Sequence, residues 1–302
     1  MLNLRIIAAC LVLLIGTTTN AQQVDTVNFS AAHYFSFEKI KSVCDYLTAN
    51  TSAYFKAVPY DDFKHLEEGF KNDKFGVAFV SPLDYVLLKD HNPELNALVA
   101  LGSEGEKKDS FQSCVITFPG SKIKKVGKHI EDFKTHKITF VQPHSTAGHL
   151  IPRVYFASFG VEPIEDYFEE VEFAGSHRNV ILSVANRIAE IGACSYPEIE
   201  YAIEAGLIDK NDIEIIWKSN PIPDSPMVVR TSLDLNLINE IRLAMQKIHL
   251  EPELWDHIKH SWGATKPEHF IETTDETYNS VRRILVGLGN FEKVLGKYMG
   301  RF

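Results

Sequence analysis

Residues 137–155, KITFVQPHSTAGHLIPRVY, decide the fold of this chain. Their first part, residues 138–141, is a short run of β-branched and aromatic residues, which predicts a strand buried between two layers. Pro143 ends that run, and Ser145 and Thr146 then stand where a helix should begin. A buried strand that passes directly into a helix is the repeating unit of α/β proteins, so the stretch predicts that class of fold.

The start of this predicted helix is also a candidate anion site. A helix N-terminus presents free backbone N–H groups and the positive end of the helix dipole, and the Ser145 and Thr146 hydroxyls add two donors. Gly148 would let a neighbouring backbone approach closely. The same pattern has a structural interpretation, in which Ser145 is an ordinary helix cap and Gly148 a packing residue, and the stretch taken alone favours it.

Strands and helices alternate on both sides of this stretch. Further strands are predicted at residues 24–30, 53–58, 76–80, 97–101, 111–118, 171–175, 188–193, 213–217 and 227–229. Helices are predicted between them at residues 36–47, 60–70, 121–133, 177–185 and 197–205, and another begins at Ser81 and Pro82. Everything after Leu233 is predicted to be helical, at residues 235–249, 252–262 and 278–298.

This order predicts two α/β lobes, each a mostly parallel sheet flanked by helices, with the first lobe interrupted by the second. Lobe 1 is expected to take residues 22–115 and 226–302, including the C-terminal helices, and lobe 2 residues 116–225. Two crossing segments should join them, near residues 113–119 and in the Pro-rich stretch 219–228.

The first 21 residues form a separate unit. Arg5 is followed by the apolar run 6–15, then by polar residues, and Ala21 ends a Thr-Asn-Ala triplet that is similar to a cleavage site. The run is too short to span a bilayer comfortably, so we predict a signal peptide at residues 1–21 and a periplasmic mature chain. Because no later segment approaches the length of a membrane helix, we expect no insertion after cleavage.

Charge and cysteine content exclude several classes of function. The 302-residue chain is 45% hydrophobic and carries 31 Lys and Arg against 40 Asp and Glu, a formal net charge of −9, which argues against nucleic acid and anionic lipid as partners. Any anion must then be held by local donors. Three cysteines follow the predicted leader, Cys44, Cys114 and Cys194, and their wide spacing gives no metal signature. We expect buried free thiols, no metal and no cofactor.

Four blocks of sequence, in order, resemble a known family. They are VSPLDYV at 80–86, FVQPHSTAGHLIP at 140–152, FAGSHRNVILSVANRIAEIGA at 173–193 and IIWKSNPIPDSPMVVR at 215–230. They are similar to the blocks of the phosphonate, phosphite and phosphate substrate-binding proteins of ABC importers. The resemblance covers roughly residues 24–250 and implies the type II periplasmic binding protein fold. It agrees with the export signal and the two lobes, which the residues predict independently.

The resemblance also implies positions for the site. The Ser-Thr-Ser with which the family grips phosphonate oxygens falls on Ser145, Thr146 and Ala147, so two hydroxyls are kept and one is lost. The family's pocket histidine falls on His177, where a partly or fully protonated imidazole could donate to an anion. Without the resemblance, a lone histidine at a helix start would be interpreted as a cap or a surface residue.

Two tyrosines of the family fall on phenylalanines here. They correspond to Phe63 and Phe111, so both ligand-facing hydroxyls are absent. Tyr60 or Tyr34 could replace them, although half-buried packing explains both tyrosines more simply.

The positions that would hold a ligand amine also differ. In family members that bind aminoalkyl phosphonates, two carboxylates hold the ammonium, and here they fall on Pro197, beside Glu198, and on Ser225, beside Asp224. Unless the register shifts by one residue at both places, this amine clamp is missing, and an unpaired cation in a closed cleft would cost several kcal/mol. Phosphite, phosphate or methylphosphonate then fits better, while a larger, less polar ligand or weak binding stays open.

Three functions are therefore weighed. The leading one is a monomeric solute-binding protein that captures a small phosphorus oxyanion for an ABC permease, with Ser81 and the loop 31–35 completing the site from lobe 1. The alternative is the same fold reporting its ligand to a sensor kinase or chemoreceptor. The third is an enzyme that uses Ser145 and His177 as nucleophile and base. No Gly-x-Ser-x-Gly elbow surrounds Ser145, and the sequence places no acidic residue to orient His177, so we predict no catalysis. The histidines at 33, 144, 149 and 177 have no metal-ligand spacing.

Overall fold

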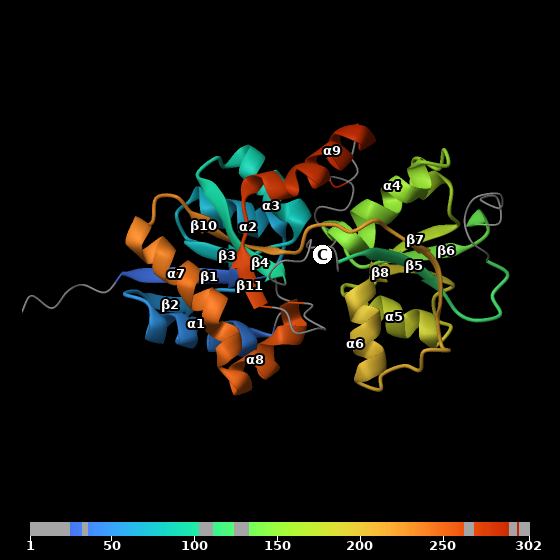
Figure 1. The fold of residues 1–302 in the computed structure, drawn as a ribbon. Coiled ribbons are helices and arrows are strands. Elements are labelled where there is room, and N and C mark those ends of the chain that lie inside the picture. The colour runs from blue at the N-terminus through green and yellow to red at the C-terminus, as the bar shows by residue number, and fades with distance from the viewer. Residues whose placement is uncertain are drawn as a thin grey trace, which may run out of the picture.

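The computed structural model describes residues 25–31, 36–102, 111–123, 133–262, 269–289 and 295, and within them the chain forms two sheets covered by helices (Figure 1). The first sheet has the strand order β11-β4-β10-β3-β1-β2 and the second β7-β6-β8-β5-β9. The first contains β1 (Thr26–Ala31), β2 (Tyr54–Ala57), β3 (Val77–Phe79), β4 (Leu95–Gly102), β10 (Pro226–Arg230) and β11 (His269–Glu272). The second contains β5 (Ser113–Thr117), β6 (Lys137–Phe140), β7 (Glu170–Phe173), β8 (Ile191–Ser195) and β9 (Glu214–Lys218).

Most strands of each sheet run in one direction. In the first sheet β1 pairs in parallel with β2 and β3, while β10 lies antiparallel between β3 and β4, and β11 is antiparallel to β4. In the second sheet β6 is parallel to β7 and β8, and β5 lies antiparallel between β8 and β9. The predicted two-lobed α/β fold with mostly parallel sheets is confirmed.

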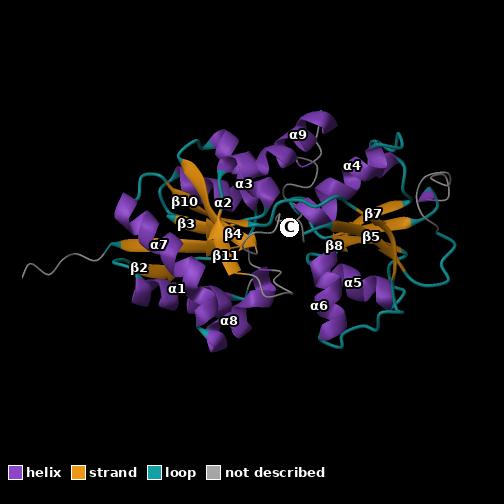
Figure 2. Ribbon diagram, in the orientation of Figure 1, coloured by secondary structure: helices purple, strands orange, loops and turns teal. Residues whose placement is uncertain are grey.

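Helices cover the faces of both sheets (Figure 2). Around the first sheet lie α1 (Phe37–Asn50), α2 (Phe63–Lys71), α3 (Pro82–His91), α7 (Leu235–Lys247), α8 (Pro252–Ile258) and α9 (Asn279–Leu288). Around the second lie α4 (Ile151–Ala157), α5 (His177–Ala185) and α6 (Tyr196–Glu204). Short helical turns lie at Thr146–Leu150, Ile164–Asp166, Ile248–Leu250, Lys259–Trp262 and Asp275–Tyr278, the first of them π-helical.

The second sheet is buried on both faces because successive side chains of a strand point to opposite sides. Along β5, Cys114 and Ile116 pack into one hydrophobic cluster with α5, and Val115 packs into the other cluster, with Phe156 of α4. A sheet covered on both faces explains why β5 is apolar throughout its centre and shows no alternation. Cys44, Cys114 and Cys194 are all buried thiols, as expected.

Two segments that lie side by side join the sheets. The Ile222 backbone N–H donates to the Phe111 carbonyl at 2.9 Å, and the Gln112 side-chain amide donates to the Ser219 carbonyl at 2.6 Å. The chain leaves the first sheet after Gly102 and enters the second at Ser113, so the first crossing precedes β5 and does not lie at 113–119 as predicted. The exact bounds of the two lobes stay a prediction.

The region after Leu233 is not entirely helical, which corrects a prediction. Residues His269–Glu272 form β11, which extends the first sheet antiparallel to β4. Only Phe270 of these four residues is buried, and one buried side chain is too little to produce a recognisable alternation in the sequence. The strand is therefore visible only through its pairing.

Several predictions fall outside the described residues. They are the signal peptide at 1–21, the loop after Ala31, most of the helix at 121–133 and the last part of the helix at 278–298. Among the helices that the structure does describe, none combines the length and apolar character needed to cross a bilayer.

Candidate functional site

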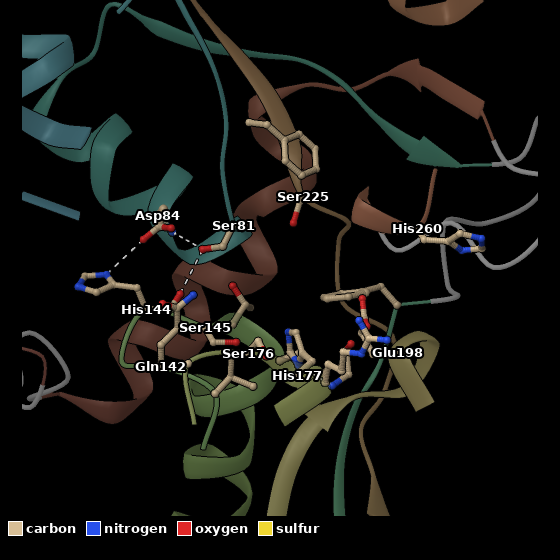
Figure 3. Close-up of a pocket in the computed structure, with 18 of the residues that line it drawn as sticks. Ser81, Asp84, Gln142, His144, Ser145, Ser176, His177, Glu198, Ser225 and His260 are labelled. Atoms are coloured by element: carbon tan, nitrogen blue, oxygen red, sulfur yellow. Dashed lines mark hydrogen bonds and ion pairs between the residues drawn. The ribbon is translucent and has the colours of Figure 1, made fainter. Parts of the chain in front are cut away.

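Four strand-to-helix turns meet at one cavity of about 320 Å³ between the two sheets (Figure 3). Each turn places a serine at the N-cap position of the helix that follows: Ser81 after β3, Ser145 after β6, Ser176 after β7 and Ser195 at the end of β8. All four line the cavity. Because β3 runs in the common direction of its sheet and β6, β7 and β8 in that of theirs, the cavity lies at the carboxyl edges of both sheets, where α/β folds bind ligands.

Helix starts of this kind favour an anion. A helix start presents backbone N–H groups that have no partner within the helix, together with the positive end of its dipole. At α3 these groups are already used, because Pro82 has no N–H and the Leu83 and Asp84 N–H groups donate to Thr146 and Ser81. Several such starts around one cavity supply positive potential without any excess of basic side chains. The arrangement therefore provides the local donors that an acidic protein needs in order to hold an anion.

Ser145 fulfils both of its sequence interpretations. Its hydroxyl accepts a hydrogen bond from the Gly148 N–H at 3.0 Å, which makes it a helix cap, and it also lines the cavity. A hydroxyl that accepts one bond still has its own proton to donate. Gly148 packs so closely that a Cβ there would collide with the Val141 side chain and with the Ser145 hydroxyl.

The neighbouring residues of this turn contact the first lobe. Thr146 is buried, and its hydroxyl accepts from the Leu83 N–H at the start of α3, at 2.9 Å. The Ser81 hydroxyl accepts from the Asp84 N–H at 3.0 Å and donates to the His144 carbonyl at 3.2 Å. Its proton is thus directed at the second lobe, so Ser81 ties the two lobes together at the edge of the cavity.

A close approach of two side chains reinforces the same contact between the lobes. Nδ1 of His144 lies 3.2 Å from Oδ1 of Asp84, and both side chains are largely buried. The His144 ring stacks on Phe63 of α2, with ring centroids 4.7 Å apart and an angle of 12° between the planes. Phe63 thus lies behind His144, and neither it nor the buried Tyr60 lines the cavity, whereas Phe111 and Ala147 do.

His177 is a neutral donor. The Ser195 backbone N–H donates to Nδ1 of His177 at 3.0 Å, so the imidazole proton of the neutral ring must be on Nε2. Removal of the ring from water lowers the pKa of His177 to about 4, which corrects the expectation of a partly or fully protonated imidazole. The ring lines the cavity and can donate one hydrogen bond there without carrying a charge.

Ser195 has a hydroxyl without a partner. It is buried, caps no N–H of α6 and finds no hydrogen-bond partner among the described residues. A buried hydroxyl left unpaired costs stability, so such a group at a cavity wall indicates a ligand that completes it.

The acidic side of the cavity differs from the prediction. Pro197 is buried within α6 and does not line the cavity, but the next residue, Glu198, does. Burial raises the pKa of the Glu198 carboxyl to about 7, while Arg178 and Lys39 oppose that rise. At the second position, Ser225 lines the cavity and Asp224 does not. A carboxylate therefore lines the cavity one residue after the position that the resemblance implies.

Comparison with known proteins identifies the family. The family model described as "ABC transporter, phosphonate, periplasmic substrate-binding protein" matches residues 35–278. The chain belongs to this family. Its members are periplasmic substrate-binding components of transporters, which agrees with the predicted extracytoplasmic location and with the prediction that the chain is not an enzyme.

Individual members of the phosphonate-binding family are distant in sequence. The chain is 23% identical over 207 residues to the phosphate-import protein PhnD of Mycolicibacterium smegmatis, a match of 65% of this chain and 62% of that protein. The binding protein of a Pseudomonas aeruginosa ABC phosphonate transporter superposes with a TM-score of 0.74 and 20% identity, covering 90% and 89% of the two chains. PhnD1 of Prochlorococcus marinus, solved with methylphosphonate, superposes with a TM-score of 0.73 and 17% sequence identity, covering 88% of this chain and 98% of that one.

Residues of the cavity that sequence reasoning missed fall into two groups. Ser176 and Ser195 repeat the pattern by which Ser145 was found, a serine between a strand and a helix, and could have been found by it. Lys39, Tyr201 and His260 have no such signal. Tyr201 of α6 stacks on His260 of the turn Lys259–Trp262, with ring centroids 4.3 Å apart. The two residues come from different lobes, so they meet only in the folded protein.

Proposed function

We propose that this chain is an extracytoplasmic solute-binding protein that holds a small phosphorus oxyanion between its lobes and delivers it to an ABC permease. The observation that carries the proposal is the meeting at one cavity of four helix starts, each with a serine at the N-cap position. Membership of the family and the phosphate import named for the M. smegmatis relative support it. The family does not favour the alternative role of reporting to a sensor kinase or chemoreceptor.

The donors suit a compact tetrahedral oxyanion. The Ser145 proton, the unpaired Ser195 hydroxyl and Nε2–H of His177 come from three different turns of lobe 2, and the backbone N–H groups of the helix starts lie among them. Hydrogen bonds to a charged group are about twice as strong as those between neutral groups. Phosphate, phosphite and methylphosphonate each present the oxygens that such a set would hold.

Closure of the lobes would complete the site. The bonds from Ser81 to His144 and from Leu83 to Thr146 cross between the lobes, as does the pair of Asp84 with His144. They hold the start of α3 against the start of the π-helical turn, so one lobe covers what the other binds. Exclusion of water by this closure strengthens each hydrogen bond to the ligand. We expect a monomer to suffice, since both walls of the cavity come from one chain.

Isothermal titration calorimetry with phosphate, phosphite and methylphosphonate tests the proposal. Ser145→Ala and Thr146→Ala should each weaken binding by about 1–3 kcal/mol if the hydroxyls contact a charged oxyanion. Ser158→Ala is the matched control, because Ser158 is an exposed serine at the end of α4. Absence of binding heat with all three anions, in a protein shown to be folded, would overturn the proposal.

A further inference from the structure

We propose that Cys114 and Cys194 form a disulfide when the chain folds outside the cytoplasm, and that this bond links β5 to β8 at the end of the second sheet nearest the cavity. Both residues are buried thiols in the structure, and the proposal concerns what an oxidising compartment makes of them. It assigns a modification site and does not depend on the identity of the ligand.

The first argument is the register of the two strands. β5 and β8 run antiparallel, and Cys114 lies directly opposite Cys194 in the ladder. Residues that face each other across two antiparallel strands point their side chains to the same side of the sheet. Both thiols accordingly pack into the same hydrophobic cluster. The two cysteines are therefore neighbours in space, although they lie far apart in the sequence.

The type of pair sets the distance between the two backbones. Hydrogen-bonded and non-hydrogen-bonded pairs alternate along an antiparallel ladder. The Tyr196 N–H donates to the Gln112 carbonyl at 2.8 Å, so the pair two residues further along is hydrogen-bonded. The intervening pair is not, because the Ser195 N–H donates to a side chain outside the ladder. Cys114 and Cys194 therefore form a hydrogen-bonded pair, with Cα atoms about 5.5 Å apart.

A disulfide fits this separation. The Cα atoms of bonded cysteines usually lie about 4.4–6.8 Å apart, most often near 5.5–6 Å. Their Cβ atoms must approach to about 3.8 Å, so bond formation draws the two strands slightly together. The ladder already supplies the pairing, and the bond needs no change of register.

The second argument is the compartment. The family to which the chain belongs is periplasmic, and disulfides form and persist in the periplasm. Burial raises the pKa of Cys114 to about 12 and that of Cys194 well above its ordinary value, so neither thiol ionises in the folded protein at neutral pH. Because the thiolate is the attacking species, the bond must form before the sheet closes around the pair.

The oxidation balances as a thiol–disulfide exchange. The thiolate of one cysteine attacks a protein or small-molecule disulfide, forms a mixed disulfide and releases one thiol of the oxidant. The thiolate of the other cysteine then attacks the mixed disulfide, forms the Sγ–Sγ bond and releases the second thiol. The two cysteines together lose two electrons and two protons, and the oxidant is reduced to two thiols.

The bond would lie where the two lobes are joined. Ser113 begins β5 directly after the first crossing, and Ser195 ends β8 at the wall of the cavity. On its other side Cys114 pairs with Lys218, the last residue of β9 before the second crossing. A cross-link here fixes the frame from which the crossings and one cavity turn start. It also closes a loop of about 80 residues, which restricts the unfolded chain.

Cys44 is the internal comparison. It is a buried thiol of α1 in the first lobe, and it packs into a different hydrophobic cluster from the pair. Neither of the other two cysteines lies opposite it. We therefore expect Cys44 to stay a thiol under the conditions that oxidise the pair.

Thiol counting tests the proposal. The chain is exported to the periplasm of a bacterial host, denatured in acid and alkylated without a reductant. We expect one alkylated cysteine in the mature chain, Cys44, and a mass spectrum in which the peptides of Cys114 and Cys194 are linked. After reduction, all three cysteines should be alkylated.

Variants assign the bond to residues. Cys114→Ala and Cys194→Ala should each show two alkylated thiols without reduction, and Cys44→Ala should show none. A reductant should lower the midpoint of thermal unfolding of the wild type by about 5 °C, because the unfolded chain loses its cross-link. The same reductant should leave the midpoint of Cys114→Ala unchanged, since that variant has no pair to reduce. Cys194→Ala gives the same comparison if Cys114→Ala does not fold.

The outcomes decide the inference without reference to ligand binding. Three alkylated cysteines in the exported wild type would overturn it, and so would a bond that includes Cys44. An equal effect of the reductant on the wild type and on both alanine variants of the pair would also overturn it. None of these results bears on the proposed function, which calorimetric titration tests separately.

Discussion

The backbone N–H of Ser195 points at Nδ1 of His177, 3.0 Å away, and thereby joins the start of α6 to the start of α5. The two residues belong to different strand-to-helix turns, and both line the cavity. The bond uses the acceptor nitrogen of the ring, so Nε2 carries the proton that remains available to a ligand. The orientation of the donor is thus set by the main chain.

His177→Phe should weaken oxyanion binding by about 1.5–3 kcal/mol, because the variant has no hydrogen-bond donor for a charged ligand. His177→Gln keeps an N–H group of similar reach and should recover part of the loss. Calorimetric titration of methylphosphonate at pH 7 measures both variants. Equal affinities of wild type and His177→Phe would show that the ring does not contact the anion.

Stability should fall at acidic pH partly through the same ring. The pKa of His177 is lowered to about 4, so between pH 6.5 and 4 the unfolded chain takes up a proton that the folded chain does not. The free energy of unfolding, measured with urea, should therefore decrease from pH 7 to pH 5, and less so in His177→Gln. An unchanged decrease in that variant would exclude the ring as a contributor.

Ser195→Ala should separate stability from binding. Removal of a buried hydroxyl that has no partner among the described residues should leave the ligand-free protein as stable as before, or more stable by about 1 kcal/mol. Binding of the oxyanion should weaken by about 1–3 kcal/mol. Thermal unfolding with and without methylphosphonate measures both quantities. A variant that is less stable without ligand would mean that the hydroxyl serves the fold.

Glu198 should make oxyanion binding depend on pH near neutrality. The pKa of its carboxyl is about 7 in the free protein, and a bound anion raises it further, so binding takes up protons and weakens as the pH rises from 6 to 8. Glu198→Gln should bind with a smaller pH dependence. Because both proteins meet the same ligand, the difference between their profiles cancels the ionisation of the phosphonate itself. Identical profiles would contradict the prediction.

Gly148→Ala should damage the seat of the oxyanion through packing. The added Cβ would collide with Val141 and with the Ser145 hydroxyl, so we expect a loss of unfolding free energy of about 1–3 kcal/mol together with weaker binding. Gly287 is the matched control, since a Cβ there meets nothing within 4 Å and the residue lies exposed in α9. Gly287→Ala should raise stability by about 0.5–1 kcal/mol and leave binding unchanged.

Those features of the fold that depend on local pattern could be predicted from the sequence. The strand and helix around Ser145 were found because a buried strand, a proline and a capping hydroxyl follow each other within a few residues. The predicted strand 188–193 was less accurate. It began at Ile188, which is 81% exposed, and β8 instead runs from Ile191 to Ser195. The hydrophobicity of Ile188 suggested that it belongs to the buried strand. The bounds of β8 are instead set by its pairing with β5.

The part of the site that depends on assembly of the two lobes could not be predicted. Lys39 and Glu198 are separated by more than 150 positions, and no periodicity relates them. The same holds for Tyr201 and His260, which meet across the lobes. The resemblance to a family placed the clamp on Pro197 because alignment gives positions to within a residue at best. Which of two neighbours faces a cavity is decided by the helix that carries them.

The serine-capped helix starts have a consequence for how selectivity can change. The amide groups that remain free at these starts belong to the main chain, so most substitutions of nearby side chains leave this part of the recognition intact. Discrimination between ligands must then come from the side chains that line the cavity, such as those of His177 and Glu198. General attraction and discrimination are thus encoded in separate parts of the molecule, and new preferences could evolve without rebuilding the scaffold.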